Sequence, residues 1–393
     1  MTGSERPQNS ILDFPKRFMV ITGIWRASSI TLNSSAQKAY IAYCVFVKLY
    51  YSLFVALAVI KFTMSVLSEN STEFRQLSYI ISMLTTLYAA MVCDTINFRR
   101  IISYIEDREN YLAGCDDEDL LKLYSLLTKT GKFVSTTLVL TVASTGSAVI
   151  LENIWRNVAI AKHNSGGNGT AEIAFIIDLY YFGLTTRKPA TAFILVNECM
   201  SVFNIIMTFA TKSITLTCMI FASYALQELQ IRLRKIGMDA DVDFGFKRAV
   251  SQHLDVISYI HDLNDLVKYL ILFEYLFESL NVAVLSVQLA AYESQTLLSS
   301  ASYLSYLLLQ IFMLGWTADE IKMQSVALSD ALYQCPWYEQ NEASKKVILV
   351  MIKLTQKPLT LTIGPFDAMT MQSALAIIKG SYSYVTLMTN SYQ

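Results

Sequence analysis

The sequence contains seven long, mostly apolar stretches, and this pattern constrains the fold more than any other feature. A helix needs about 20 mostly apolar residues to cross the hydrocarbon core of a bilayer. Because backbone groups in lipid must be hydrogen-bonded within the protein, stretches of this length predict membrane-spanning helices. The predicted spans are Tyr40–Leu67, Phe74–Phe98, Phe133–Trp155, Ala190–Leu226, Tyr269–Tyr292, Leu297–Trp316 and Phe366–Asn390.

Composition supports the same class of protein. Of the 393 residues, 53% are hydrophobic and 16% are charged, whereas soluble proteins average about 25% charged residues. The deficit of charge favours one membrane-embedded unit over two or three soluble domains. The net charge of −1 gives no indication of nucleic-acid binding. We therefore predict an all-α membrane protein.

Lys and Arg are concentrated on one side of the predicted membrane. They occur in the N-terminal segment and in the connections after the second, fourth and sixth spans, and the other connections carry few or none. Because positive residues are retained in the cytoplasm, we predict a cytoplasmic N-terminus and an extracellular C-terminus. Asn70 and Asn168 begin glycosylation sequons in connections assigned to the outside. They are the predicted glycosylation sites.

The cytoplasmic connections contain further helical patterns. Such segments form either a cytoplasmic helical layer or amphipathic helices lying on the membrane surface. Apolar residues recur at helical spacing over Asp119–Thr130, Phe246–Asp265, Met323–Tyr333 and Ala343–Leu354.

The seventh span differs from the others because proline and glycine interrupt the approach to it. Pro358 and the pair Gly364–Pro365 predict that one helix ends near Gln356 and that another begins near Phe366. This second helix is rich in small and hydroxylated residues. Such a composition suits either a helix packed among other helices or a helix that lines water. Both alternatives stay open from the residues alone.

Two other features have more than one interpretation. The outer connection contains an apolar, aromatic segment, Ala174–Leu184, that folds back as a lid over the bundle or packs statically against the spans. Four charged residues lie deep within spans and pair across helices or line a wet path, and we favour pairing. They are Glu198, Lys212, Glu274 and Glu278.

Motifs of enzymes and of the common metal and nucleotide sites are missing. The chain has no HExxH, GxSxG, Walker A or glycine-rich dinucleotide sequence. Its three histidines lack a companion cluster of Cys or carboxylates. We expect no enzymatic activity, no cofactor and no metal site. A G-protein-coupled receptor is disfavoured by the predicted cytoplasmic N-terminus, and a transporter by the lack of paired broken helices.

A pocket for a small apolar molecule needs aromatic and aliphatic walls with a few polar groups. Spans two, three, four and six offer such residues, although core packing is the favoured explanation for any single one of them. The candidates are Tyr88, Ser147, Ala148, Leu151, Trp155, Phe203, Met207, Thr211, Tyr303 and Tyr306.

The C-terminal stretch carries a recognisable signature. KPLTLTIGPF (Lys357–Phe366), Ser373 and LAIIKGSYSYV (Leu375–Val385) resemble the C-terminal motif of insect odorant receptors. In that motif a Pro-Leu-x-(Leu/Ile)-Thr-Ala-Gly run precedes Lys-x-Ser-Tyr-Ser-Tyr-Phe. Ile363 stands here where Ala is usual, and Val385 where Phe is usual. The candidate pocket residues also resemble the family's odorant-binding positions, chiefly through Trp155 and the pair Tyr303 and Tyr306.

The resemblance implies an odorant-specific subunit of a ligand-gated, non-selective cation channel in the plasma membrane of olfactory neuron dendrites or cilia. It implies a tetramer with the shared co-receptor, assembled through a cytoplasmic helical layer. The expected parts are a cytoplasmic segment (1–39), a six-span ligand-binding bundle (40–316), and anchor helices with a pore-lining seventh span (317–393). The chain lacks the long insertion of the co-receptor between spans four and five. A gustatory-type channel that acts without the co-receptor is the alternative within the superfamily.

The resemblance also assigns pore residues, because the motif sets the register of the seventh span. Counted from Tyr384, the last tyrosine of the motif, the hydrophobic gate of the family falls on Leu387. The polar residue that faces the ions falls on Asn390, where the co-receptor has Gln. A ring of leucines closes a pore by dewetting, and a ring of asparagines carries no charge. This combination is expected of weakly selective cation passage.

Overall fold

The computed structural model describes residues 10–25, 34–67, 74–165, 174–180, 191–236, 242–290, 297–335 and 337–391, and nearly all of them are helical. The α-helices are α1 (Asp13–Ile21), α2 (Ser34–Leu67), α3 (Phe74–Cys93), α4 (Ile96–Ala113), α5 (Glu118–Ser165), α6 (Thr191–Lys235), α7 (Val242–Ala290), α8 (Leu297–Gln334), α9 (Glu342–Thr355) and α10 (Met371–Ser391). A 3-10 helix spans Trp337–Glu339, and strands β1 (Thr362–Ile363) and β2 (Asp367–Ala368) form an antiparallel hairpin.

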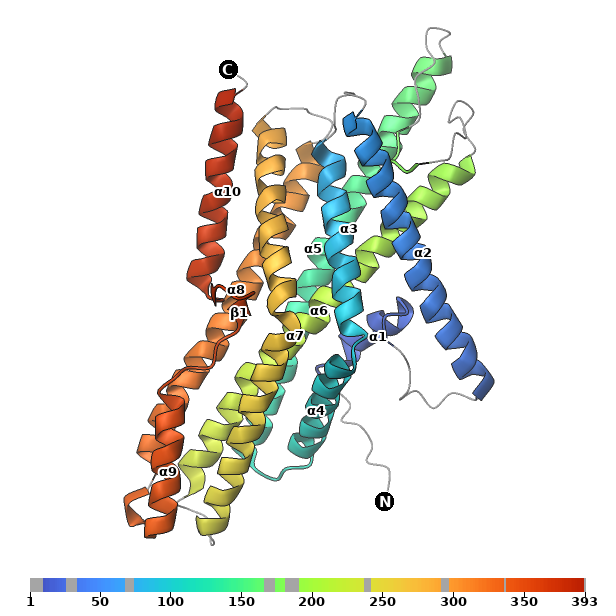
Figure 1. Cartoon of the computed structure of the whole chain (residues 1–393). Coiled ribbons are helices and arrows are strands. Elements are labelled where there is room, and N and C mark those ends of the chain that lie inside the picture. Colours follow the sequence, from blue (N-terminus) through green and yellow to red (C-terminus); the bar gives the residue numbers. More distant parts are fainter. Residues whose placement is uncertain are drawn as a thin grey trace.

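Among the described residues, six helices are long and apolar enough to cross a membrane, namely α2, α3, α5, α6, α7 and α8. The first six predicted spans fall on these six helices. The most buried of them is α6, with 89% of its apolar window inside the protein, against 28% for α5. It packs against α1, α3, α5, α7 and α8, and it crosses the middle of the bundle in Figure 1. The core is therefore built around α6.

Helices α5 to α8 are longer than a bilayer requires and continue past the apolar bundle. Their extensions, together with α4 and α9, form the end of the molecule drawn at the bottom of Figure 1, here called the anchor end. The four inner helical patterns of the sequence all lie in α5, α7, α8 and α9. The three patterns in α5, α7 and α8 are therefore continuous with the spans, whereas the fourth forms a separate helix, α9.

Two predicted boundaries are wrong. The second span was expected to run to Phe98, but α3 ends at Cys93 and α4 begins at Ile96. Thr95 separates them because its side chain caps α4, accepting a hydrogen bond from the backbone N–H of Phe98 at 3.2 Å. The last helix was expected to begin near Phe366, but it begins at Met371.

The β1–β2 hairpin accounts for the late start of α10. Gly364 adopts φ +57° in its turn, a conformation that favours glycine, and a Cβ there would lie 2.7 Å from Leu272 Cδ2. The hairpin is attached to α7, since the Gly364 N–H donates to the Lys268 carbonyl at 2.9 Å and the Thr362 N–H donates to Asn264 Oδ1 at 2.8 Å. The Gly-Pro interruption therefore anchors the start of α10 on α7.

Candidate functional site

A cavity of about 80 Å³ lies between α3, α5, α6, α8 and the segment 174–180. It is small beside the roughly 300–1,000 Å³ of drug-sized pockets. It suits a small molecule, or a larger one that displaces lining side chains. The lining residues are Tyr79, Ser82, Val142, Thr145, Gly146, Val149, Ile176, Ile177, Ser201, Asn204, Ile205, Thr208, Tyr303 and Tyr306.

Three tyrosines form one wall of this cavity. The rings of Tyr303 and Tyr306 are stacked with centroids 6.3 Å apart, and the ring of Tyr79 stacks on Tyr303 at the same distance. Aliphatic side chains from α5, α6 and the outer segment form the facing walls. Such walls hold small apolar molecules through dispersion and desolvation, with little dependence on ligand shape.

The segment 174–180 closes the cavity by packing into the bundle. Asn157 exchanges two hydrogen bonds with the backbone of Ala174, at 2.8 and 3.0 Å. Asn197 binds the backbone of Ile177 in the same way, at 2.7 and 3.4 Å. Ile176 and Ile177 are buried and line the cavity. Residues 174–180 pack against the spans and residues 181–184 lie outside the described chain, and both interpretations of the segment, a lid and static packing, stay predictions.

The structure brings two of the ten predicted pocket residues, Tyr303 and Tyr306, to the cavity. The other eight do not line it. Ala148, Met207 and Thr211 are buried elsewhere, Phe203 packs on Tyr51, and Tyr88 packs on Phe273. Ser147, Leu151 and Trp155 are exposed, the last two by 62% and 71%.

The lining residues of α5 and α6 lie on faces beside the predicted ones. Each helix contributes positions spaced by three, one and three, the pattern of a single helix face. They are Val142, Thr145, Gly146 and Val149 on α5, and Ser201, Asn204, Ile205 and Thr208 on α6. Small residues mark both faces, and Gly146 allows Ile205 to approach closely, since a Cβ there would lie 2.5 Å from Ile205 Cδ1. This stripe of small residues is the signal in the sequence that identifies the face.

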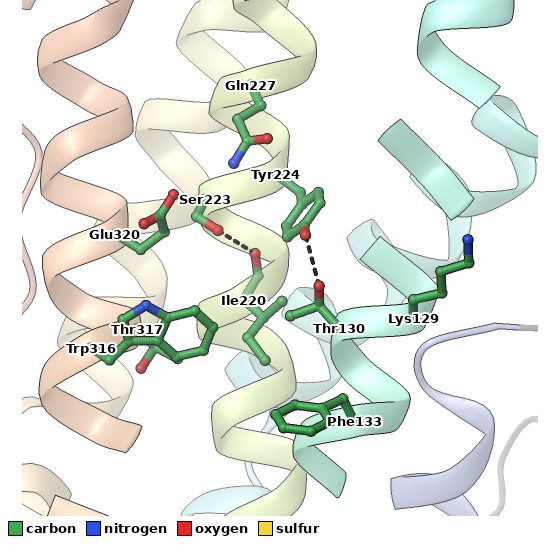
Figure 2. Close-up of a pocket in the computed structure, with 10 residues that line it drawn as sticks. All are labelled: Lys129, Thr130, Phe133, Ile220, Ser223, Tyr224, Gln227, Trp316, Thr317 and Glu320. Atoms are coloured by element: carbon green, nitrogen blue, oxygen red, sulfur yellow. Dashed lines mark hydrogen bonds between the residues drawn. The ribbon is translucent and has the colours of Figure 1, made fainter. Parts of the chain in front are cut away.

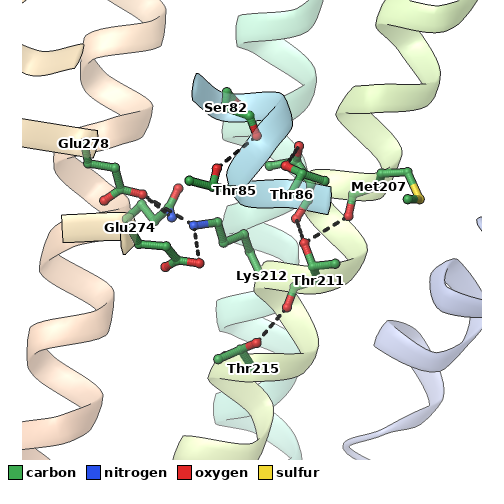
Figure 3. Close-up of polar contacts among 11 residues, drawn as sticks. Ser82, Thr85, Thr86, Met207, Thr211, Lys212, Thr215, Glu274 and Glu278 are labelled. Carbon is green, nitrogen blue, oxygen red and sulfur yellow. Dashed lines mark hydrogen bonds and ion pairs between the residues drawn. The ribbon is translucent and has the colours of Figure 1, made fainter. Parts of the chain in front are cut away.

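A cluster of buried charges joins α6 to α7, and Figure 3 shows Lys212 directed toward Glu274 and Glu278. Lys212 Nζ of α6 lies 2.7 Å from Glu274 Oε1 and 3.4 Å from Glu278 Oε1, both on α7. Gln310 of α8 donates to the same Glu278 oxygen at 2.5 Å. Glu198 accepts a hydrogen bond from Asn153 at 2.5 Å. The prediction that the buried charges pair across helices is confirmed for the three charges of this cluster.

A second, larger cavity of about 420 Å³ lies nearer the anchor end, between α5, α6 and α8. Figure 2 shows its lining, which includes Trp316, Phe133 and the charged side chains of Lys129 and Glu320. The hydroxyls of Thr130 and Tyr224 are 2.9 Å apart across it. Because this cavity has charged residues in its wall, it suits a small apolar ligand less well than the first one does.

The predicted pore and glycosylation residues are described only in part. Tyr384, Leu387 and Asn390 belong to α10, but their side chains lie outside the described part of the chain. Asn70 and Asn168 also lie outside the described residues. These assignments stay predictions.

Residues 125–382 match the model of the 7tm Odorant receptor family. Odorant receptor Or2 of Anopheles gambiae is 30% identical over 188 residues, and odorant receptor 10 of Aedes albopictus is 31% identical over 153. The aligned regions cover 45% and 39% of this chain, and 50% and 41% of those relatives, so the chain spans about half of their length or less.

The fold is similar to that of the olfactory receptor OR5 of the insect Machilis hrabei, solved in complex with eugenol. The TM-score is 0.77 at 17% identity, and the match covers 97% of each chain. A second structure of OR5 gives a TM-score of 0.72 at 19% identity, over 95% of this chain and 96% of OR5. The fold and the family model place the chain among receptors and not among enzymes. The chain belongs to the 7tm odorant receptor family.

Proposed function

We propose that the cavity between α3, α5, α6 and α8 binds small, volatile, mostly apolar molecules. The observation that carries this proposal is the aromatic wall of Tyr79, Tyr303 and Tyr306 in a member of the odorant receptor family. Buried Ile176 and Ile177 also line the cavity. The eugenol complex of OR5, which has the same fold, supports a small-molecule ligand.

Binding at this cavity gates a non-selective cation pathway in the plasma membrane. The proposed route runs from the cavity walls on α8 to α10, because α8 and α7 are the long helices that contact α10. Figure 1 places α10 at the edge of the bundle, where it is available to meet other subunits. We place Tyr384, Leu387 and Asn390 along this pathway. A ligand opens it only by binding the open state more tightly than the closed state.

The proposed partner is the insect odorant receptor co-receptor, in a hetero-oligomer with four subunits. The anchor end supports this arrangement because it extends the spans into a broad helical surface. The alternative within the superfamily is a gustatory-type channel that needs no co-receptor.

The deciding experiment is whole-cell current in cells that express the chain with or without an insect co-receptor, during challenge with a panel of volatiles. Odorant-evoked cation current only in co-expressing cells is the expected result. Current without the co-receptor supports the gustatory-type alternative. Silence in both, with surface expression confirmed by labelling, contradicts the proposal.

A further inference from the structure

The cavity of about 420 Å³ between α5, α6 and α8 has two opposite charges in its wall that are not paired with each other or with other residues of the described chain. Lys129 of α5 forms no ion pair with any residue that the structure describes. Glu320 of α8 accepts a hydrogen bond from Gln324 at 2.8 Å, but it too has no basic partner in the described chain. A ligand of complementary charge can therefore bind both groups without breaking an existing ion pair.

The hydroxyl groups of the same wall already have partners. The hydroxyls of Thr130 and Tyr224 are hydrogen-bonded to each other at 2.9 Å. Ser223 and Thr317 donate to carbonyls of their own helices at 2.8 and 2.9 Å. The two charges are therefore the main polar groups that this cavity offers to a ligand. Because one is positive and the other negative, the matching ligand is a zwitterion.

The two sides of the cavity indicate which charged groups the zwitterion carries. Trp316 and Glu320 are four residues apart on α8, so they share a helix face. An indole ring beside a carboxylate is a combination that binds quaternary ammonium groups. Lys129 lies on α5, on the opposite side of the cavity in Figure 2, and a lysine ammonium binds phosphate as a point charge. The matching ligand therefore contains a phosphate and a quaternary ammonium group, as phosphocholine does.

The cavity also lies at the level where apolar spans end. The apolar stretch of α5 begins at Phe133, and that of α8 ends at Trp316. Lys129 and Glu320 lie one turn beyond these two residues, toward the anchor end. On the side toward the apolar bundle, Phe133 and Phe312 are 70% and 52% exposed. Charges at one end and exposed apolar side chains at the other match a membrane lipid, whose headgroup is polar and whose chains are apolar.

We propose that this cavity binds the headgroup of a phosphatidylcholine molecule whose acyl chains lie along the exposed apolar surface beside it. Glu320 and Trp316 hold the trimethylammonium group, and Lys129 holds the phosphate. The bound lipid joins α5 to α8 across α6 and stabilises the folded chain by binding only to it. The proposal concerns a different cavity from the proposed odorant site and does not depend on it.

The test adds lipids to the purified full-length chain in a maltoside detergent. The probes are dioleoyl phosphatidylcholine, dioleoyl phosphatidylglycerol, which has the same chains and a phosphate but no ammonium group, and free phosphocholine. Two readouts are taken, namely the lipid concentration that gives half of the rise in melting temperature and the lipid retained in native mass spectrometry. The wild-type chain is expected to prefer phosphatidylcholine over phosphatidylglycerol by about tenfold. Free phosphocholine is expected to give no rise at the same concentrations, because it lacks the apolar chains.

Four variants assign the preference to the wall residues. Glu320→Gln removes the partner of the ammonium group and is expected to bring the ratio of the two lipids close to one. Trp316→Leu is expected to weaken phosphatidylcholine and to leave phosphatidylglycerol unchanged. Lys129→Gln is expected to weaken both lipids, since both carry a phosphate, without reversing the preference. Asp330→Asn is the matched control, because Asp330 is an exposed carboxylate of α8 that does not line the cavity, and it is expected to preserve the ratio.

A wild-type chain without a preference for phosphatidylcholine overturns the proposal, as does an unchanged ratio in Glu320→Gln or an equal fall in Asp330→Asn. A rise with free phosphocholine as large as with the lipid overturns the assignment to a lipid. If Glu320→Gln does not fold, the ratio in Trp316→Leu decides. Neither readout uses an odorant or a co-receptor, so a failure of the proposed function leaves this inference standing, and a failure of this inference leaves the proposed function standing.

Discussion

Lys212 of α6 and Glu274 of α7 form an ion pair at 2.7 Å, with both side chains less than a tenth exposed. Glu278, one turn further along α7, approaches the same ammonium group at 3.4 Å. Charges taken out of water lose hydration, and only close geometry with further hydrogen bonds offsets this cost. The cluster therefore joins α6 to α7 through contacts that tolerate little displacement.

Loss of the ammonium group leaves two carboxylates facing each other in an apolar bundle. We expect Lys212→Met to reduce stability by about 3–5 kcal/mol, the usual effect of breaking a buried ion pair. Thermal unfolding of the purified protein in detergent measures this. The triple variant Lys212→Met, Glu274→Gln, Glu278→Gln has no buried charge in the cluster and should recover most of the loss. Equal instability of the single and triple variants would contradict this account.

At the anchor end, Glu228 of α6 is buried between two arginines. Its Oε1 lies 2.6 Å from Arg108 of α4 and 2.8 Å from Arg232. We expect Glu228→Gln to cost about 3 kcal/mol, because it removes the anion from two partly buried guanidinium groups. The control is Lys122→Ala, which breaks an exposed pair with Glu118 and should change stability by about 0–1 kcal/mol.

Three guanidinium groups lie over the ring of Tyr111. The Cζ atoms of Arg108, Arg232 and Arg248 are 5.0, 5.1 and 5.3 Å from the ring centroid. These residues come from α4, α6 and α7, so the ring connects three helices of the anchor end. Cation–π contacts at partly exposed sites contribute about 0.5–1 kcal/mol each. We expect Tyr111→Leu to destabilise the protein by about 1–2 kcal/mol and Tyr111→Phe to cost less, as measured by thermal unfolding. Equal losses would assign the effect to the hydroxyl.

We expect the folding stability of the protein to depend on pH through Glu109 of α4, at the anchor end. Burial raises the pKa of its carboxyl above the ordinary value, although hydrogen bonds from Ser10 and the Ile11 N–H act in the opposite direction. An acid with a raised pKa binds its proton more tightly in the folded protein. Its contribution to stability is therefore complete below the unfolded pKa of about 4.3 and is lost as the pH rises through the folded pKa.

The test is to measure thermal unfolding at a series of pH values from about 4 to about 8. Glu109→Gln should flatten the decline in stability with rising pH, because the amide does not titrate. The exposed Glu118→Gln should leave the decline as it is in the wild-type chain. A decline that persists unchanged in Glu109→Gln would assign it to another group.

The positions of the first six spans could be predicted because length and apolarity alone decide them. The break between α3 and α4 could not be predicted, because in the sequence Asp94 and Thr95 have the pattern expected at the polar end of a single span. The role of Asp94 depends on a distant partner, since it forms an ion pair with Lys48 of α2 at 2.7 Å.

The face of a span that meets the cavity was harder to predict than the span itself. In a soluble helix, polar residues mark the outer face, but in α5 the lipid-facing surface is as apolar as the packed one. Trp155 and Leu151 are predicted pocket residues because they share a helical face with Ala148, and Trp155 also because of the family resemblance, but both are exposed in the structure. Small residues such as Gly146 identify the packed side of a span better than large apolar residues do, because they permit close approach of the neighbouring helix.

Gly315 of α8 allows the start of α10 to approach. A Cβ at this position would lie 2.8 Å from the Cβ of Ala374 and 3.4 Å from the carbonyl oxygen of Thr370. We expect Gly315→Ala to destabilise the protein by about 1–3 kcal/mol through overpacking and to shift the odorant concentration that gives half-maximal current. Adding Ala374→Gly removes the clash and should restore the response.

The control for Gly315 is Gly380, also in a helix, where a Cβ would meet no atom within 4 Å in the described chain. Gly380→Ala should be neutral or stabilising by about 0.5–1 kcal/mol, because alanine suits a helix better than glycine. A response to Gly315→Ala no larger than the response to Gly380→Ala would show that the α8–α10 contact does not matter for gating.

The proposed gate at Leu387 can be tested against another leucine of the same helix. Leu387 lies three residues from Asn390, so the two share one face of α10, and Tyr384 lies three residues from Leu387 on its other side. If Leu387 closes the pathway by apolar contact worth about 1.5–3 kcal/mol, Leu387→Ala should raise ligand-independent current by at least roughly tenfold. Leu375 is twelve residues earlier, about 120° around the helix, and is 48% exposed. Leu375→Ala should leave the basal current unchanged, and a similar rise in both variants would exclude a gate specific to Leu387.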